Sequence, residues 1–258
     1  MTTAEYRKKA GIILKKHYSE SIFVVMIFLI VYIFTKIWDV AQIVFILYNN
    51  NADPSDLFSS TGILESVLKM LSAIVSFAAL TPLLTGGLWW FYQTACGNDN
   101  MNILKLYTGF KLNLRASLLY AVMWILSMLS LLPTGICWSA AFYLFNTASR
   151  YTNQAVVLFI VLQIFMFGVF LIGIYLKCIL SMIFAPFIFI NHPDMNIFKI
   201  IHKSRKIIYG SKLECLKLIL TYIPAMLPVI TIPFILPRAV MAMSVMACDK
   251  IGGAYWEE

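Results

Sequence analysis

Residues 192–222 decide the fold, and they read HPDMNIFKIIHKSRKIIYGSKLECLKLILTY. In a helix, one face of this stretch is apolar and consists of Ile197, Ile200, Ile201, Ser204 and Ile208. The opposite face is basic and consists of Lys199, His202, Lys203 and Lys206. Asp194 is suited to the N-cap of this helix, and Gly210 to its C-terminal cap. A helix with this pattern lies flat on a membrane surface, with its lysines toward anionic headgroups.

Part of the stretch occurs earlier in the chain. Residues 100–106, NMNILKL, resemble residues 194–200, DMNIFKI, and a Leu-Pro pair follows each copy at a similar distance. The pattern predicts two copies of one unit, residues 75–135 and 165–230, each with a membrane helix, an interfacial helix and a second membrane helix. Internal repeats of this kind are common in polytopic membrane proteins.

Several motifs occur in a fixed order along the chain. TPLLTGG at residues 81–87 precedes LYTGFK at 106–111, and APF at 185–187 precedes NHPD at 191–194 and SRKIIYG at 204–210. Over roughly residues 75–250 this order resembles an uncharacterised family of six-span integral membrane proteins of Gram-positive bacteria. That family is itself similar to the membrane domain of glycerophosphodiester phosphodiesterases. The resemblance implies a bacterial plasma membrane and a six-span topology, and it implies no catalytic residues.

The composition also indicates a membrane protein. Of the 258 residues, 61% are hydrophobic and 12% are charged, whereas soluble proteins carry about 25% charged residues. The net charge of +8 is concentrated in particular loops, so we attribute it to membrane topology and not to nucleic-acid binding. We therefore predict an all-α, polytopic transmembrane bundle, a single domain over residues 1–258, with about six spans and two interfacial amphipathic helices.

The spans follow from the apolar runs. A basic amphipathic segment at residues 1–20 precedes a first span at 21–48, a second at 63–95 and a third at 116–133. Residues 136–153 are expected at the outer interface, and residues 154–190 as one long helix kinked near Pro186. Residues 213–249 contain four prolines and predict a hairpin of two short, broken helices. Small residues at 85–87 are expected at a close helix contact, and the aromatic residues at 89–92 in a belt at the inner interface.

The orientation follows from the lysines and arginines. Most of the twenty positive residues fall in the segments before residue 18, around 105–115 and at 199–217. The positive-inside rule therefore places these segments, and both termini, in the cytoplasm.

Catalytic and metal-binding motifs are missing from the sequence. The three histidines lack metal-ligand spacing, there is no Walker A or GxSxG motif, and the five cysteines are expected to be small packing residues. We expect no metal, no cofactor and no enzymatic activity.

Candidate functional residues are charged residues in or beside the spans. Lys177 lies within an apolar run, where burial of its charge would cost about 2.5–3.5 kcal/mol; the alternative is that its side chain extends to the nearer interface. Arg205 borders the apolar face of the basic helix, and Arg238 follows a proline in the last span, where it either anchors the outer end or faces a cavity. The candidate lipid-binding residues are Lys177, Lys199, Lys203, Arg205, Lys206 and Arg238. The candidate ion pairs are Lys36 with Asp39, and Glu214 with a neighbouring lysine.

Two functions fit these observations. The first is a non-enzymatic plasma-membrane protein that acts through anionic lipids, a second copy or a membrane protein partner. The alternative is a transporter or channel for a small anionic or amphiphilic solute.

Overall fold

The computed structural model describes residues 1–50, 63–98, 106–147 and 154–254. Within these ranges every regular element is a helix, which confirms the predicted all-α fold. Five helices are long and apolar enough to cross a membrane, so the chain has the build of a multi-pass membrane protein.

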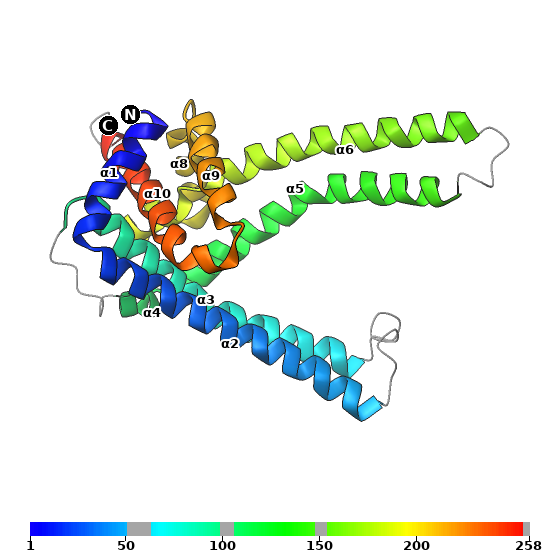
Figure 1. Ribbon diagram of the computed structural model, residues 1–258, viewed down its shortest axis with the longest axis horizontal. Helices are drawn as coiled ribbons and strands as arrows, with labels where there is room; N and C mark the ends of the chain where they lie inside the picture. The colour runs from blue at the N-terminus through cyan, green and yellow to red at the C-terminus, as the bar shows by residue number, and fades with distance from the viewer. Residues whose placement is uncertain (51–62, 99–105, 148–153, 255–258) are drawn as a thin grey trace.

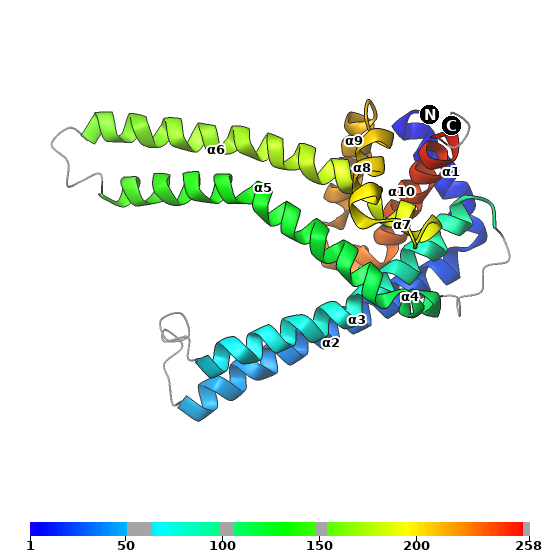
Figure 2. The same cartoon turned by 180° about the vertical axis from the view of Figure 1, so that it is seen from behind.

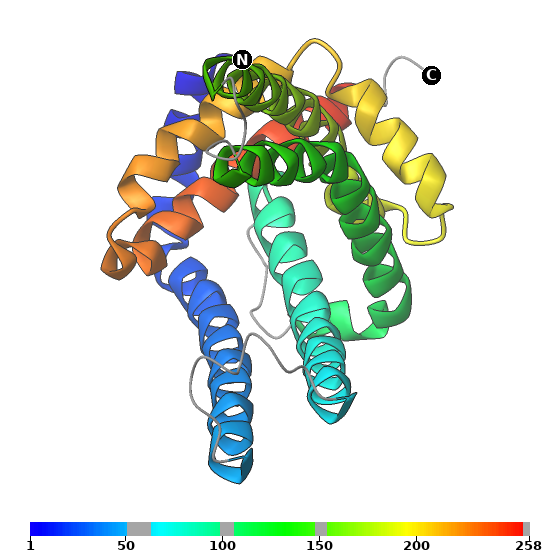
Figure 3. The same cartoon turned by 90° about the vertical axis from the view of Figure 1, so that its right-hand side faces the viewer.

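The long helices form two hairpins, which we call the arms. The first arm pairs α2 (Tyr18–Asn50) with α3 (Ile63–Ala95), and the second pairs α5 (Asn113–Thr147) with α6 (Gln154–Met182). The arms diverge from a compact region at one end of the molecule, which we call the base (Figure 1). Seen along the arms, the two pairs are clearly separate (Figure 3). Large apolar side chains such as Phe34, Val75 and Phe170 are exposed along both arms, as expected of surfaces that face lipid.

The third span is longer than predicted. We expected it to end at residues 133–135, with residues 136–153 at the interface, but α5 continues through Pro133 to Thr147. A proline removes one backbone hydrogen bond from a helix. Ending the helix inside the hydrocarbon would leave several backbone groups without hydrogen-bond partners, which costs more free energy than the one bond lost at Pro133.

Residues 154–191 cross once, as predicted. The helix breaks between α6 and α7 (Ala185–Asn191), and Pro186 lies in the first turn of α7, where its missing N–H would have no intrahelical partner anyway. The kink near Pro186 is thereby confirmed.

The basic stretch forms α8 (Ile197–Ile207), and its predicted faces are confirmed. Ile200, Ile201 and Ser204 are buried against the base, while Lys199, Arg205 and Lys206 are exposed. The Ser204 hydroxyl donates to the Ser181 carbonyl across 2.9 Å and so fixes α8 against the end of α6.

The predicted N-cap of α8 is wrong. Asn196 caps the helix by accepting from the Phe198 N–H at 3.0 Å. Asp194 instead accepts from Arg115 Nη1 at 2.9 Å, and the same nitrogen donates to the Pro193 carbonyl at 3.0 Å. The start of α5 and the turn before α8 therefore lie side by side at the base. Gly210 adopts the left-handed φ of +86° just beyond the helix, as a C-terminal glycine does.

The proline-rich hairpin is confirmed, but it changes the span count. It comprises α9 (Lys212–Met226), the single 3-10 turn η4 (Val229–Thr231) and α10 (Ile232–Ala254). With 15 residues, α9 extends only about 22 Å, less than the hydrocarbon thickness of about 30 Å. In the described chain we therefore find five full-length spans and one short helix, where the sequence predicted about six spans.

The N-terminus and the last described turn of α10 both lie at the base (Figures 1 and 2). The first helix, α1 (Thr3–Lys16), packs along α10 and buries Tyr6, Ala10 and Leu14. Its basic residues are exposed, which confirms the predicted basic amphipathic N-terminal segment.

A close backbone approach joins α3 to α4 (Thr108–Lys111). A side chain at Gly109 would collide with the Pro82 carbonyl and would lie 2.8 Å from the Gly86 nitrogen; one at Gly86 would collide with the Leu106 carbonyl. The predicted close contact at residues 85–87 is confirmed, with α4 as the partner.

The predicted aromatic belt at residues 89–92 is wrong. Trp90 and Tyr92 are buried in the core of the base, where Trp90 packs edge-on against Phe91. These rings face the protein interior because α1, α7 and α10 cover this end of α3.

The repeat remains a prediction. The two copies have the same order of elements, since α3, α4 and α5 correspond to α6–α7, α8 and α9. The two interfacial helices differ in length, because α4 has 4 residues and α8 has 11. Residues 99–105, which carry most of the first copy's motif, lie outside the described residues.

Candidate functional site

The base contains a cavity of about 910 Å³ between α1, α9 and α10, which we call the basic groove. Four positive side chains line it: Arg7, Lys8 and Lys15 from α1 and Arg238 from α10. None of the described residues that line the groove is acidic. Like charges held together without counter-charges attract an anion from solution or from a lipid headgroup.

Two contacts join the helices that form the groove. The Tyr6 hydroxyl donates to Asp249 Oδ2 at 2.6 Å, which joins the start of α1 to the end of α10. Arg7 Cζ lies 5.7 Å from the centre of the Tyr222 ring, a cation–π contact that joins α1 to α9. Because α1 runs along α10 from Asp249 toward Arg238, Lys15 reaches the same groove as Arg238.

A second cavity, which we call the apolar pocket, lies on the other side of Tyr222. It has a volume of about 290 Å³, is open on one side and is lined by residues of α3, α7, α9 and α10. Its lining includes Phe187, Ile219, Met243 and Ala239, and Tyr222 is shared with the basic groove. The neighbours Arg238 and Ala239 therefore face different cavities from the same turn of α10.

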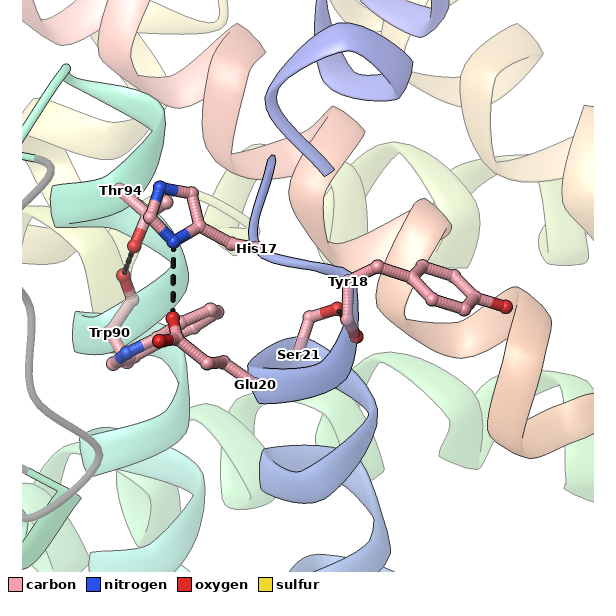
Figure 4. Close-up of polar contacts among 6 residues, drawn as sticks. All are labelled: His17, Tyr18, Glu20, Ser21, Trp90 and Thr94. Carbon is pink, nitrogen blue, oxygen red and sulfur yellow. Dashed lines mark hydrogen bonds and ion pairs between the residues drawn. The ribbon is translucent and has the colours of Figure 1, made fainter. Parts of the chain in front are cut away.

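A polar cluster connects the start of α2 with the end of α3 (Figure 4). His17 Nδ1 lies 3.1 Å from Glu20 Oε2, and the imidazole meets the Trp90 ring edge-on with ring centres 6.4 Å apart. The Thr94 hydroxyl donates to the Trp90 carbonyl within the same helix, and the Ser21 hydroxyl to the Tyr18 carbonyl. Because both hydroxyls are bound to backbone within their own helices, we interpret the cluster as a structural joint between α1, α2 and α3.

Arg238 lines the basic groove, so it faces a cavity beside the broken hairpin, the second of its two predicted placements. Its role in binding stays a prediction. The α8 residues Lys199, Arg205 and Lys206 are exposed on the outer face of the base and Lys203 is half-buried, so they form a surface and not a cavity.

Lys177 is exposed on α6, four residues before Ser181, which contacts α8. One helical turn, about 6 Å, therefore separates it from the level of the interfacial helix. A lysine stem spans this distance, so the structure favours extension to the interface over a buried functional charge.

Of the two predicted ion pairs, Lys36 with Asp39 stays a prediction, because Asp39 lies outside the described side chains. Lys36 Nζ lies 5.9 Å from the centre of the Tyr32 ring. Glu214 is half-buried near Tyr6. Burial and the hydrogen bond to Asp249 are the main causes that raise the pKa of the Tyr6 phenol, and the charge of Glu214 raises it further.

Two cysteines are paired, which corrects the expectation that all five are packing residues. Cys96, after α3, and Cys248, in α10, form a disulfide with their Cα atoms 5.9 Å apart. They are 152 residues apart in sequence, so no spacing motif could have revealed the pair. Cys215 is buried, and Cys137 and Cys178 are half-buried thiols.

Sequence reasoning missed three of the four groove cations. Arg7, Gly11 and Lys15 recur at a helical spacing, and this pattern indicates one face of α1. The pattern could not show that α10 would place Arg238 opposite that face.

In the part of the chain that is described, no group of His, Cys, Asp or Glu side chains is arranged to hold a metal ion. Comparisons of the chain with protein-family models, with curated proteins and with solved structures found no match.

Proposed function

We propose that this protein is a non-enzymatic, multi-pass protein of a bacterial plasma membrane that acts by binding anionic lipids, alone or with a protein partner. In this proposal the base faces the cytoplasm together with both termini, and the resemblance to the six-span family of Gram-positive bacteria supports that location.

The observation that carries the proposal is the distribution of charge over the base. The outer face of α8 exposes Lys199, Arg205 and Lys206, and α1 exposes a further set of lysines. Each cation near an anionic membrane surface contributes about 1 kcal/mol of attraction. Several such cations at one end of a membrane protein favour anionic over zwitterionic lipids.

The lining of the basic groove also fits binding better than catalysis. Its polar groups are guanidinium, ammonium and phenol groups, with no carboxylate or imidazole among the described lining residues to act as a base near neutral pH. Such a set holds an anion but offers no general base.

Lipid binding can be tested by native mass spectrometry of the purified full chain in detergent. We expect phosphatidylglycerol to bind more tightly than phosphatidylcholine with the same acyl chains, and the preference to fall when Lys199, Arg205 and Lys206 are all changed to Gln. A Lys36→Gln variant, on α2 in the first arm, serves as the control away from the base's cationic surface. Equal binding of the two lipids by the native chain would contradict the proposal.

The alternative function is transport of a small anionic or amphiphilic solute, and Arg238 is the observation that favours it. In that case proteoliposomes should show a saturable anion flux that Arg238→Gln reduces and Lys177→Met leaves unchanged. Flux no greater than that of empty liposomes would leave lipid binding as the role.

A further inference from the structure

We propose that the basic groove and the apolar pocket form one binding site for a single anionic phospholipid. The phosphate lies in the groove, and part of one acyl chain lies in the pocket. This inference rests on the proposed function and deepens it, because it assigns a defined site and ligand class to the lipid binding.

The two cavities are neighbours that share Tyr222 as a lining residue, and Arg238 and Ala239 present adjacent positions of α10 to one cavity each. A ligand that lies across Tyr222 therefore places one end among cations and the other among apolar side chains. Only an amphiphile has matching chemistry at both ends.

The charge of the groove selects an anionic head. Arg7 and Arg238 come from helices at opposite ends of the sequence and line the same cavity with Lys8 and Lys15. Guanidinium groups bind phosphate oxygens through paired N–H donors. The contact with Tyr222 holds the Arg7 guanidinium at the border of the apolar pocket, close to where the head and the tail of the ligand would join.

The pocket provides the complementary apolar wall. Aliphatic and aromatic side chains from α7, α9 and α10 line it, including Phe187, Ile219 and Met243. Ala239 leaves room on the α10 side, so a larger side chain there would fill the space for an acyl chain without changing the charge of the groove.

The test measures lipid affinity by native mass spectrometry of the purified full chain and of four single-site variants, one of them the charge-retaining Arg238→Lys. Arg238→Gln removes a groove cation, Ala239→Phe fills the pocket, and Lys36→Gln removes a positive charge from α2 in the first arm, away from the base, as a matched control. Phosphatidylglycerol, phosphatidylcholine with the same chains, and glycerol phosphate are the three ligands. Glycerol phosphate carries the headgroup's phosphate but no acyl chain, so its affinity distinguishes binding of a lipid from binding of a free phosphate ester.

We expect Arg238→Gln to weaken phosphatidylglycerol binding by about fivefold, the equivalent of one cation's attraction, and Lys36→Gln to weaken it much less. Ala239→Phe should weaken binding of phosphatidylglycerol and leave binding of glycerol phosphate unchanged. Arg238→Lys should restore most of the affinity, which separates loss of charge from loss of folding.

Four outcomes would overturn the inference. If Ala239→Phe has no effect while Arg238→Gln does, only a headgroup binds in the groove. If glycerol phosphate binds as tightly as the lipid, the ligand is a free phosphate ester. If neither variant changes binding but the native chain still prefers phosphatidylglycerol to phosphatidylcholine, the site is wrong and the proposed function stands. If that preference is missing in the native chain, the proposed function fails as well.

Discussion

The Tyr6 hydroxyl donates a hydrogen bond to Asp249 across 2.6 Å, joining the first helix of the chain to the last. Tyr6 is fully buried, and 243 residues separate the two partners. This contact joins the start of α1, the helix that supplies three of the groove's four cations, to the end of α10.

Replacing Tyr6 with Phe should therefore lower the free energy of unfolding by about 1 kcal/mol, the usual net value of a hydrogen bond. It should also reduce lipid affinity, because α1 would no longer be fixed at that end. Thermal unfolding in detergent checks the first effect. Tyr18→Phe is a control that keeps the Tyr6 contact, and an unfolding temperature equal in both variants would contradict the prediction.

Stability should also fall at alkaline pH. Burial and the bond to Asp249 raise the pKa of Tyr6 above its usual value, so the folded chain keeps the phenol proton longer than the unfolded chain. The stabilisation is complete below the unfolded pKa of about 10 and is lost as the pH rises above it. We expect the unfolding temperature to drop more steeply above that pH in the native chain than in Tyr6→Phe.

The approach of α4 to α3 tolerates no side chain at Gly109. Gly109→Ala would meet the Pro82 carbonyl, so backbone would have to move, at a cost of about 1–3 kcal/mol. Gly173→Ala is the matched control, since a side chain there meets nothing within 4 Å and alanine favours a helix. Gly109→Ala should therefore lower the unfolding temperature, and Gly173→Ala should raise it.

The disulfide between Cys96 and Cys248 lies at the base, the end that the positive-inside rule places in the reducing cytoplasm. We therefore expect both cysteines to be thiols in growing cells and to pair after oxidation. Pairing should raise the free energy of unfolding by about 2–4 kcal/mol. Mass spectrometry of alkylated peptides, with Cys137 as the unpaired reference, reports the state. A bond already present in cells treated with alkylating agent before lysis would place the base in an oxidising compartment.

Labelling can test the orientation directly. The contact of Arg115 with Asp194 places the beginnings of α5 and α8 at the same end of the molecule. In a cysteine-free background, single cysteines at Lys111 and Lys203 should both be protected from an impermeant thiol reagent in intact cells and react after permeabilisation. Reaction of one but not the other in intact cells would contradict the shared location.

The sequence was most informative where local chemistry dominates. The second span begins and ends at the predicted residues 63 and 95, and the faces of α8 follow directly from its periodicity. These features depend on apolar spacing within one segment, which a sequence displays.

The errors arise where a distant segment decides the outcome. Pro133 was taken as an end of a span, but the lipid environment favours continuing the helix. Asp194 was predicted as a cap, but Arg115, 79 residues away, binds it instead. The groove and the disulfide depend on the packing of α10 beside α1 and α3, and no local pattern encodes such pairings.

The divergence of the arms has a consequence for how the molecule responds to its surroundings. Each arm helix extends roughly 44–52 Å, well beyond a hydrocarbon core of about 30 Å, so tilting would let it bury more of its apolar length. The angle between the arms is then the coordinate that adjusts to membrane thickness, opening in thin bilayers and closing in thick ones. Because the arms meet at the base, such a change would reach the helices that enclose the groove.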